Sequence, residues 1–401
     1  MADFGGADLD AFRAEARAWL DENFPKSLAS DTDAQQAAAQ SPAAPTGDFA
    51  VWKQRMAEKG WGAPTWPKQY GGGGLSSAEA RVLADEMNRM GAVNPIAGMG
   101  ISMFGPTLLE YGNEAQKQQH IPPIVRGEIR WCQGFSEPGA GSDLASLQTK
   151  AEDKGDHFLV NGQKIWTSGA QYADWCFCLV RTDNTKKHEG ISFVLIDMKS
   201  PGVEARPIRL IAGNSPFCET FFTDVKVPKE NLVGPLNGGW TIGKRLLQFE
   251  RNGMGNRQNG PAPAPVHEVA KDYVGVDRTG RLADRDLRSR ITQHEMANRL
   301  VQLTARRIAV EAKGNQGPSA ATSIMKNASM KAGQERQELL VEIFGHQGLG
   351  WEGEGFKPEE LQATRAMLSA KAFTIFGGST EIQNNIISKR ILGLPELTQS
   401  R

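Results

Sequence analysis

The 401-residue sequence is short of cysteine, of net charge and of targeting signals. Its four cysteines are too few and too scattered for a disulfide scaffold, which predicts a reducing compartment. The 46 basic and 46 acidic side chains balance, so we expect neither a nucleic-acid surface spread over the chain nor an acidic tail. The acidic N-terminus lacks the apolar core of a secretory signal, and we expect a cytoplasmic protein.

Several familiar motifs are missing as well. The sequence contains no Gly-x-Ser-x-Gly, no Walker loop and no strand-linked Gly-x-Gly-x-x-Gly. Cys176 and Cys178 have no second Cys/His pair at zinc spacing, which favours two packed thiols over a metal site. The uncharged stretch 90–109 carries four glycines and two prolines, so it predicts a buried helix and loop rather than a membrane span.

The sequence periodicity changes twice along the chain and predicts three domains. Residues 1–128 have helical spacing, with a surface loop expected in the Ala/Gln/Pro-rich stretch 31–47. β-Branched and aromatic runs separated by turns fill 129–234, and the helical period returns over 235–401. The expected fold is therefore α+β and multidomain, with an all-α N-terminal domain, a middle β-barrel or sandwich and a C-terminal helical domain.

Two neighbouring segments indicate a site for a flat cofactor. The first, Ser136-Glu-Pro-Gly-Ala-Gly-Ser-Asp143, predicts a tight loop whose amides can approach a polar ring edge. The second places Trp166 at a strand end between Lys164 and Ser168, which offers a flat aromatic face beside hydroxyl donors. On spacing alone, a glycine-rich turn and a core tryptophan explain these residues equally well.

These segments resemble the acyl-CoA dehydrogenase family, and the resemblance extends over nearly the whole chain. It is carried most specifically by 136–143, and further by the stretches 60–75, 222–231 and 378–387. It implies an N-terminal helical domain, a β domain and a C-terminal four-helix domain. It also implies FAD as cofactor, an acyl-CoA substrate oxidised to the 2-enoyl-CoA, an electron-transferring flavoprotein as acceptor, and a homo-oligomer (dimer or tetramer).

The resemblance assigns individual residues to the cofactor and substrate. Those expected around the flavin ring are Gln133, Phe135, Ser136, Trp166 and Ser168. Of these, Trp166 would cover the ring and Ser168 would donate to or orient N5, the hydride acceptor. Ser142 is expected to contact the flavin or the pantetheine of the substrate. Ser379 and Glu381 are expected at the adenine-ribose half of FAD.

The reaction needs a base, because a proton must leave the carbon next to the thioester while hydride goes to the flavin. Many family members carry a glutamate directly before the glycine of the C-terminal motif, but this chain has Phe376-Gly377-Gly378. A second family arrangement, a glutamate followed by arginine on an earlier helix, corresponds to Glu250-Arg251. We expect Glu250 to be the base, Arg251 to orient it or bind substrate, and the Gly377 N–H to donate to the carbonyl oxygen. A solvated glutamate on a helix face is the alternative for Glu250.

Departures from the family pattern leave other functions open. The run Gly260-Pro-Ala-Pro-Ala-Pro265 predicts a break in the helix after the base. The family's Arg-x-x-Phe-Gly, which contacts FAD phosphates, is replaced by 276–280, where Arg278 or Arg281 could substitute. The adenine-side Gly-Gly reads Gly345-His346. The alternatives are a flavin monooxygenase or oxidase of the same fold, and one subunit of a hetero-oligomer with an incomplete FAD site.

Two features of the sequence bear on the size of the acyl group. Residues 97–103 are small and flexible, and position 377 has no side chain, which together indicate room for a branched or bulky group. Core packing explains the Gly/Met run at 97–103 equally well.

Overall fold

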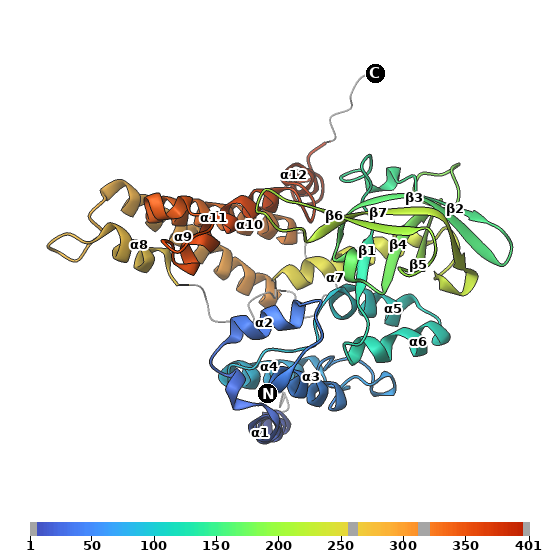
Figure 1. Ribbon diagram of the computed structural model, residues 1–401, viewed down its shortest axis with the longest axis horizontal. Coiled ribbons are helices and arrows are strands. Elements are labelled where there is room, and N and C mark those ends of the chain that lie inside the picture. The colour runs from blue at the N-terminus through green and yellow to red at the C-terminus, as the bar shows by residue number, and fades with distance from the viewer. Residues whose placement is uncertain (1–5, 256–263, 312–320, 396–401) are drawn as a thin grey trace. The chain divides into compact units, whose positions relative to one another are not determined.

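The computed structural model describes residues 6–255, 264–311 and 321–395, which form two compact units. The first unit holds the N-terminal helices, the strands and helix α7 (Gly239–Gly255). The second holds the later helices together with the turn 209–215. The order of helices, strands and helices along the chain confirms the expected α+β fold (Figure 1). Helix α7, with which the expected C-terminal domain begins, packs against elements of the first unit.

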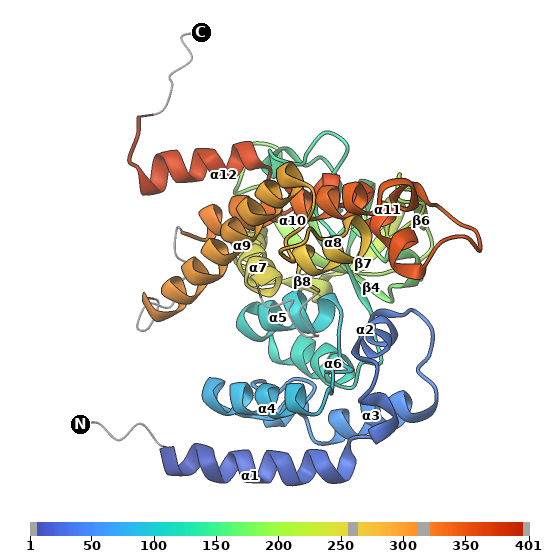
Figure 2. The same cartoon turned by 90° about the vertical axis from the view of Figure 1, so that its left-hand side faces the viewer.

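The N-terminal helices build two layers. The described residues form α1 (Gly6–Asn23), α2 (Thr32–Gln40), α3 (Gly47–Glu58), α4 (Ser77–Arg89), α5 (Gly105–Tyr111) and α6 (Glu114–Val125). In Figure 2, α5 and α6 lie between the strands and the layer of α1, α3 and α4. The outer layer has a core of its own, in which Leu20, Trp52 and Leu83 are buried.

The loop predicted over 31–47 is wrong for its first half, which is helix α2. Asp31 caps this helix by accepting a hydrogen bond from the Ala34 N–H at 2.8 Å. Gln35 is 2% exposed, and its amide bonds to the backbone at Leu28, Gly91 and Val93. A buried glutamine with three backbone partners holds the segment in place, and composition alone does not reveal that contact.

Helices α1 and α4 are joined through a buried carboxylate. The Glu86 side chain is 3% exposed and accepts hydrogen bonds from Arg13, Arg17 and Arg89 at 2.8–3.0 Å. The bond from Arg17 is the largest influence, and with the other two guanidinium groups it outweighs burial and lowers the pKa of Glu86 to about 2. Glu86 therefore remains charged throughout the neutral range.

The strands form one eight-stranded sheet in the described part of the chain. They are β1 (Trp131–Gly134), β2 (Lys150–Asp153), β3 (His157–Ser168), β4 (Trp175–Arg181), β5 (Ile191–Asp197), β6 (Val203–Ile208), β7 (Phe217–Pro228) and β8 (Leu232–Val233). Their order in space is β6-β7-β3-β2-β4-β5-β8, and β1 pairs in parallel with β4.

Strands β4 and β5 are buried on both faces, which explains their continuous apolar sequences. One face, including Phe177 and Leu179, packs with residues of α5 and α6. The other face, including Cys176 and Cys178, packs with residues of β3 and β7. These two cysteines are buried free thiols, as predicted.

A histidine is buried beneath this sheet. His120 on α6 is 1% exposed, and its ring centroid lies 5.1 Å from that of Trp131 and 4.8 Å from that of Trp175. Its Nε2 has no hydrogen-bond partner among the described residues. Burial lowers the pKa of His120 to about 4, so the ring is uncharged at neutral pH.

We predict that His120 makes the fold sensitive to acid. Because its pKa falls from 6.5 in the unfolded chain to about 4 in the folded one, the unfolded state binds the extra proton between these values. The neutral ring's contribution to stability is complete above pH 6.5. It is lost as the pH falls toward 4, by roughly 3 kcal/mol in all. Urea denaturation at about pH 4.5 and about pH 7.5 measures the loss. His120→Phe cannot titrate and should show a smaller pH dependence; an equal dependence would contradict the assignment.

The second unit is helical. Its described residues form α8 (Val266–Val274), α9 (Arg285–Glu311), α10 (Ala321–Phe344), α11 (Pro358–Ala370) and α12 (Thr380–Ile386). Helix α10 contacts each of the other four, and Ile291, Leu339 and Ile343 are buried in the core that it shares with α8, α9 and α11. The described part of α7 ends at Gly255 and α8 begins at Val266; most of the proline run that predicts a helix break lies outside the described residues.

Candidate functional site

A β-bulge shapes the strand end that carries Trp166. Along β3, Val160 and Lys164 are buried on one face, and the strand then gains one residue relative to β7 between Lys164 and Thr167. Trp166 lies in this bulge with φ = 60°, in the left-handed region that L side chains adopt only at a cost. Its indole is 52% exposed and lies edge-on to Phe217. The bulge therefore presents on the surface a tryptophan that regular alternation would bury.

The glycine-rich loop is tied to the same strand end. The Ile165 N–H donates to the Ser136 carbonyl at 2.9 Å, and the Lys164 ammonium donates to the Phe135 carbonyl at 3.1 Å. Lys164 Nζ also lies 2.8 Å from a carboxylate oxygen of Glu137. Three consecutive loop residues are thus bonded to the two residues that precede Trp166.

The predicted residues before the loop differ in what they can offer a ligand. Gln133 and Ser136 are half-buried, whereas the ring of Phe135 is packed edge-on against Phe177 in the core, 6.0 Å between centroids. Phe135 can therefore meet a ligand only through its backbone, while Gln133 and Ser136 retain accessible polar side chains.

The rest of the loop leaves open space. A Cβ placed on Gly139 or on Gly141 meets no atom within 4 Å. Ser142 is exposed, and Ser168, two residues beyond Trp166, is half-buried. This side of the site combines open backbone, hydroxyl groups and one aromatic face, which is the chemistry that the sequence predicts for a planar cofactor.

The far end of the loop is fixed by Arg181, which is 6% exposed. Its guanidinium donates to the carbonyls of Ala145 at 2.6 Å, Leu147 at 3.2 Å and Lys187 at 2.8 Å. Burial lowers the pKa of Arg181. On the surface, Lys187 also pairs with Asp143 at 2.8 Å. The loop is thereby attached at both ends to the sheet.

Helix α7, which carries Glu250 and Arg251, lies beside the segment 97–103. Residues Gly100–Phe104 form a π-helical turn, a geometry frequent at functional sites, and this turn contacts both α7 and β1. The first unit thus brings together the start of β1 at Trp131, the segment 97–103 and the helix of the predicted base. The side chains of Glu250 and Arg251 lie outside the described residues.

In the second unit, the C-terminal motif forms a tight turn. Gly377 and Gly378 have φ values of 67° and 91°, and a Cβ on Gly378 would lie 2.4 Å from Nε2 of Gln383. That buried amide donates to the Gly377 carbonyl at 3.2 Å. Ser379 caps α12 with its hydroxyl. Glu381 is exposed, and bonds from its own N–H and from Ser379 lower its pKa.

The cations available in the second unit differ in exposure. Arg278 and Arg281 are exposed on a turn closed by the Asp277 N–H, which donates to the Arg281 carbonyl at 2.7 Å. Lys326 on α10 is 7% exposed, and its ammonium has no hydrogen-bond partner among the described residues. Burial lowers the pKa of Lys326, against the charge of Glu381, which raises it. Lys326 therefore has capacity for an anionic ligand.

Sequence reasoning missed Glu137, Lys164 and Lys326 as site residues. For Lys164 a signal exists, because strand alternation places it on the buried face with Phe158 and Val160, where a lysine needs a carboxylate partner. The helical spacing around Lys326 carries no such signal.

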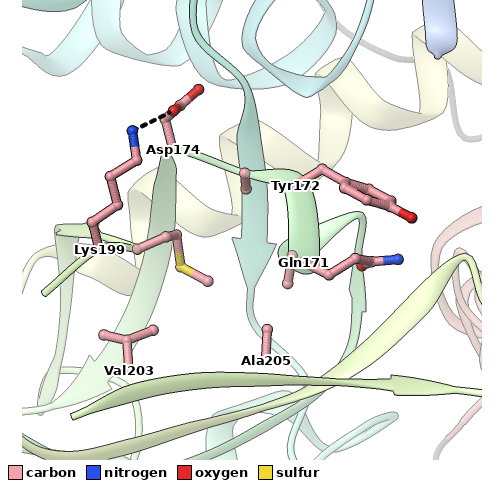
Figure 3. A pocket seen from close by; sticks show the side chains of 9 residues that line it. Gln171, Tyr172, Asp174, Lys199, Val203 and Ala205 are labelled. Atoms are coloured by element: carbon pink, nitrogen blue, oxygen red, sulfur yellow. Dashed lines mark hydrogen bonds and ion pairs between the residues drawn. The ribbon is translucent and has the colours of Figure 1, made fainter. Parts of the chain in front are cut away.

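A separate surface pocket of about 420 Å³ lies on the β domain (Figure 3). It is lined by the turn Ala170–Tyr172, by Val203 and Ala205 of β6, and by an ion pair between Lys199 and Asp174 at 3.1 Å. None of the predicted site residues lines this pocket, so it is distinct from the candidate site.

The described ranges hold neither a metal cluster nor a membrane-spanning helix. Within 6–255, 264–311 and 321–395, no group of three His, Cys, Asp or Glu side chains could hold a metal ion. No helix in these ranges is both long enough and apolar enough to cross a membrane.

Family models for three consecutive domains match the chain. The acyl-CoA dehydrogenase N-terminal domain matches residues 6–128, the middle domain 132–225 and the C-terminal domain 237–392. The chain belongs to the acyl-CoA dehydrogenase family. The resemblance found in the sequence is confirmed, and the protein is a flavoprotein oxidoreductase of a family that depends on FAD.

Relatives of known name support this membership. Acyl-CoA dehydrogenase IpdE1 of Mycobacterium tuberculosis is 35% identical over 97% of this chain and 98% of its own length. Acyl-CoA dehydrogenase FadE34 of the same organism is 39% identical over 85% of this chain and 45% of its own length.

Solved structures of the family have the same fold. The Tcur3481-Tcur3483 steroid ACAD is 30% identical, with a TM-score of 0.75 over 99% of this chain and 100% of that one. The ChsE4-ChsE5 complex from Mycobacterium tuberculosis is 29% identical, with a TM-score of 0.70 over 99% of this chain and 100% of that one.

We predict that the left-handed backbone at Trp166 makes a glycine variant more stable than an alanine variant, which reverses the usual order of stability. Glycine adopts φ = 60° without steric cost, whereas alanine does not. Trp166→Gly should therefore be at least as stable as Trp166→Ala, with a difference of about 1 kcal/mol in favour of glycine. Urea unfolding of the two variants measures the difference. As a control, Tyr172→Gly and Tyr172→Ala, at another exposed aromatic of the same domain, should show the ordinary order.

Proposed function

We propose that this protein catalyses the α,β-dehydrogenation of an acyl-CoA thioester to the 2-enoyl-CoA. The observation that carries the proposal is the bulged end of β3, where the exposed indole of Trp166 accompanies the half-buried hydroxyl of Ser168. An exposed indole beside polar donors suits stacking on an isoalloxazine ring and hydrogen bonding to its heteroatoms. FAD, when bound, supplies the hydride acceptor at N5.

Glu250 is proposed as the base. An ionised carboxylate in a water-poor pocket can remove the proton next to a thioester at neutral pH. The contact of α7 with the π-helical turn Gly100–Phe104 supports a role for this helix in lining the acyl pocket. Arg251 is proposed to orient Glu250 or to bind substrate. The Gly377 N–H is proposed to donate to the thioester oxygen as negative charge develops there.

The residues proposed to bind FAD form two groups, and each group is described within its own unit. Around the ring these are Gln133, the Phe135 backbone, Ser136, Trp166 and Ser168, with Ser142 for the ring or the pantetheine. For the nucleotide half they are Ser379, Glu381, Arg278 and Arg281, and Lys326 is an additional cation for a phosphate group. A guanidinium or ammonium group near a diphosphate supplies the charge that the family's missing arginine would carry.

A bulky, ring-containing acyl group is the proposed substrate class. One structurally similar protein is named a steroid ACAD. In this chain Gly377 has no side chain, and Ala97 and Gly98 are exposed at the start of the segment that contacts α7. These features support room for a wide acyl group.

A hetero-oligomeric dehydrogenase is the second candidate. It is favoured by the exposed positions of Arg278 and Arg281 and by the names of two similar structures, each of which joins a pair of proteins. A flavin oxidase or monooxygenase is less well supported, since it has no need for a base at Glu250. An electron-transferring flavoprotein is proposed to accept the electrons from the reduced flavin. A homo-oligomer is the first proposed assembly. A cytoplasmic location is also proposed, and the four buried free thiols support it.

Glu250→Gln should reduce turnover by roughly 100-fold or more, because the amide cannot accept the proton. The flavin should remain bound, since the change keeps the shape of the side chain. Turnover is followed by anaerobic bleaching at 450 nm with an acyl-CoA, and bound flavin by absorbance. Glu58→Gln, on the N-terminal helix α3, is the control. Substantial residual bleaching would contradict the assignment of Glu250 as the base. Oxygen consumption without formation of enoyl-CoA would favour an oxidase.

A panel of straight, branched and ring-containing acyl-CoA thioesters tests the substrate class. The ring-containing members should bleach the wild-type flavin fastest, because the acyl pocket is proposed to be wide. Preference for straight chains would contradict this proposal.

The flavin absorbance of the chain purified alone tests the assembly. FAD bound at full occupancy supports a self-sufficient enzyme, and its absence supports a subunit that needs a partner.

A further inference from the structure

A buried ion pair joins Lys164, on the strand end that carries Trp166, to Glu137 of the glycine-rich loop. The Lys164 side chain is 0% exposed and that of Glu137 is 8% exposed, with 2.8 Å between Nζ and Oε1. The Glu137 carboxylate also accepts from the backbone N–H groups of Gln148 at 2.6 Å and Thr149 at 2.9 Å. Glu137 thus has three hydrogen bonds, and Lys164 has two oxygen acceptors.

The Glu137 carboxylate is ionised at neutral pH and faces the Lys164 ammonium. Burial is the largest influence on Glu137 and favours its neutral form, but the charge of Lys164 and the hydrogen bonds to the carboxylate together lower its pKa below the ordinary value. A buried pair of full charges is expensive to separate, because each charge left alone inside the protein loses both its solvent and its partner. The pair therefore resists any movement that separates the loop from the strand.

The ion pair lies directly before Trp166 in the strand and joins this part of the strand to the glycine-rich loop. Loop residues Phe135, Ser136 and Glu137 are each bonded to Lys164 or Ile165. The next residue, Trp166, has the left-handed backbone, and the strand gains its extra residue at the same place. A strained residue persists only where its surroundings determine it, and these three bonds immediately precede the strain.

We propose that the Lys164–Glu137 ion pair is a positioning device, which holds the strained Trp166 and the Ser136 segment in one fixed arrangement before the flavin ring binds. The inference rests on the proposed function, because it assumes that these two elements contact FAD. Neither Lys164 nor Glu137 touches the reacting atoms in this proposal. They act through the residues on either side of them, so that the ring meets a site that needs no rearrangement.

The test compares two buried carboxylates of the same unit. Glu137→Gln removes the charge from the pair, and Glu86→Gln removes a similarly buried charge from the arginine cluster between α1 and α4. Both variants should lose stability to urea. Titration of flavin-free protein with FAD should show an affinity about tenfold or more weaker in Glu137→Gln, and within about twofold of wild type in Glu86→Gln. The visible spectrum of bound flavin should shift in Glu137→Gln alone.

A double variant guards against simple misfolding. Lys164→Met with Glu137→Gln removes both charges, so no unpaired charge is left inside and the chain should fold better than with either single change. If the pair positions the site, the double variant folds but still binds FAD weakly with a shifted spectrum. Wild-type affinity and spectrum in the folded double variant would overturn the proposal, as would equal effects of Glu137→Gln and Glu86→Gln on flavin binding.

Different results would contradict the proposed function and the positioning role of the ion pair. If wild-type protein binds no FAD and bleaches with no acyl-CoA under any assembly, the proposed function is wrong. If wild type binds FAD and turns over, but Glu137→Gln binds it unchanged, only the positioning role is wrong.

Discussion

A buried lysine ammonium needs an anionic partner, because it has lost its hydration. In this fold the partner of Lys164 lies on the loop and not in the sheet. The partner, Glu137, lies in the turn between β1 and β2, so that neutralising one charge also fixes the path of the loop. Arg181 repeats the principle at the far end of the loop with backbone carbonyls as acceptors. At Gly139 and Gly141, between these two anchors, the loop has open space beside its backbone.

The two faces of strand β4 pack against different elements, and this restricts the register of the strand. Phe177 and Leu179 pack toward the N-terminal helices, while Cys176 and Cys178 pack toward β3 and β7. A strand with both faces buried cannot slip by one residue, because a slip would exchange the two sets of side chains. The register of β4 therefore determines where β1 lies, and with it the position of Gln133.

Much of the architecture could be predicted from the sequence, since helical and strand periods follow from burial of regular faces. The region of the loop and Trp166 could be predicted as a site from its residue types. The exposure of Trp166 could not, because it depends on a one-residue bulge between Lys164 and Thr167 that arises from pairing with a distant strand. Helix α2 was missed for a similar reason, since the contacts of Gln35 are made with residues that lie far along the chain.

The three cysteines next to Gly134 give the molecule an internal reporter of opening. Cys132, Cys176 and Cys178 are fully buried, and a Cβ on Gly134 would lie within 2.9 Å of two of their sulfur atoms. A hydrogen bond with Cys132 raises the pKa of Cys176 well above its ordinary value, and burial does the same for Cys178. Thiol reagents attack the thiolate, so these side chains are inert while the sheet is closed. The rate at which they are modified thus measures how often β4 separates from β3 and β7 in the native protein.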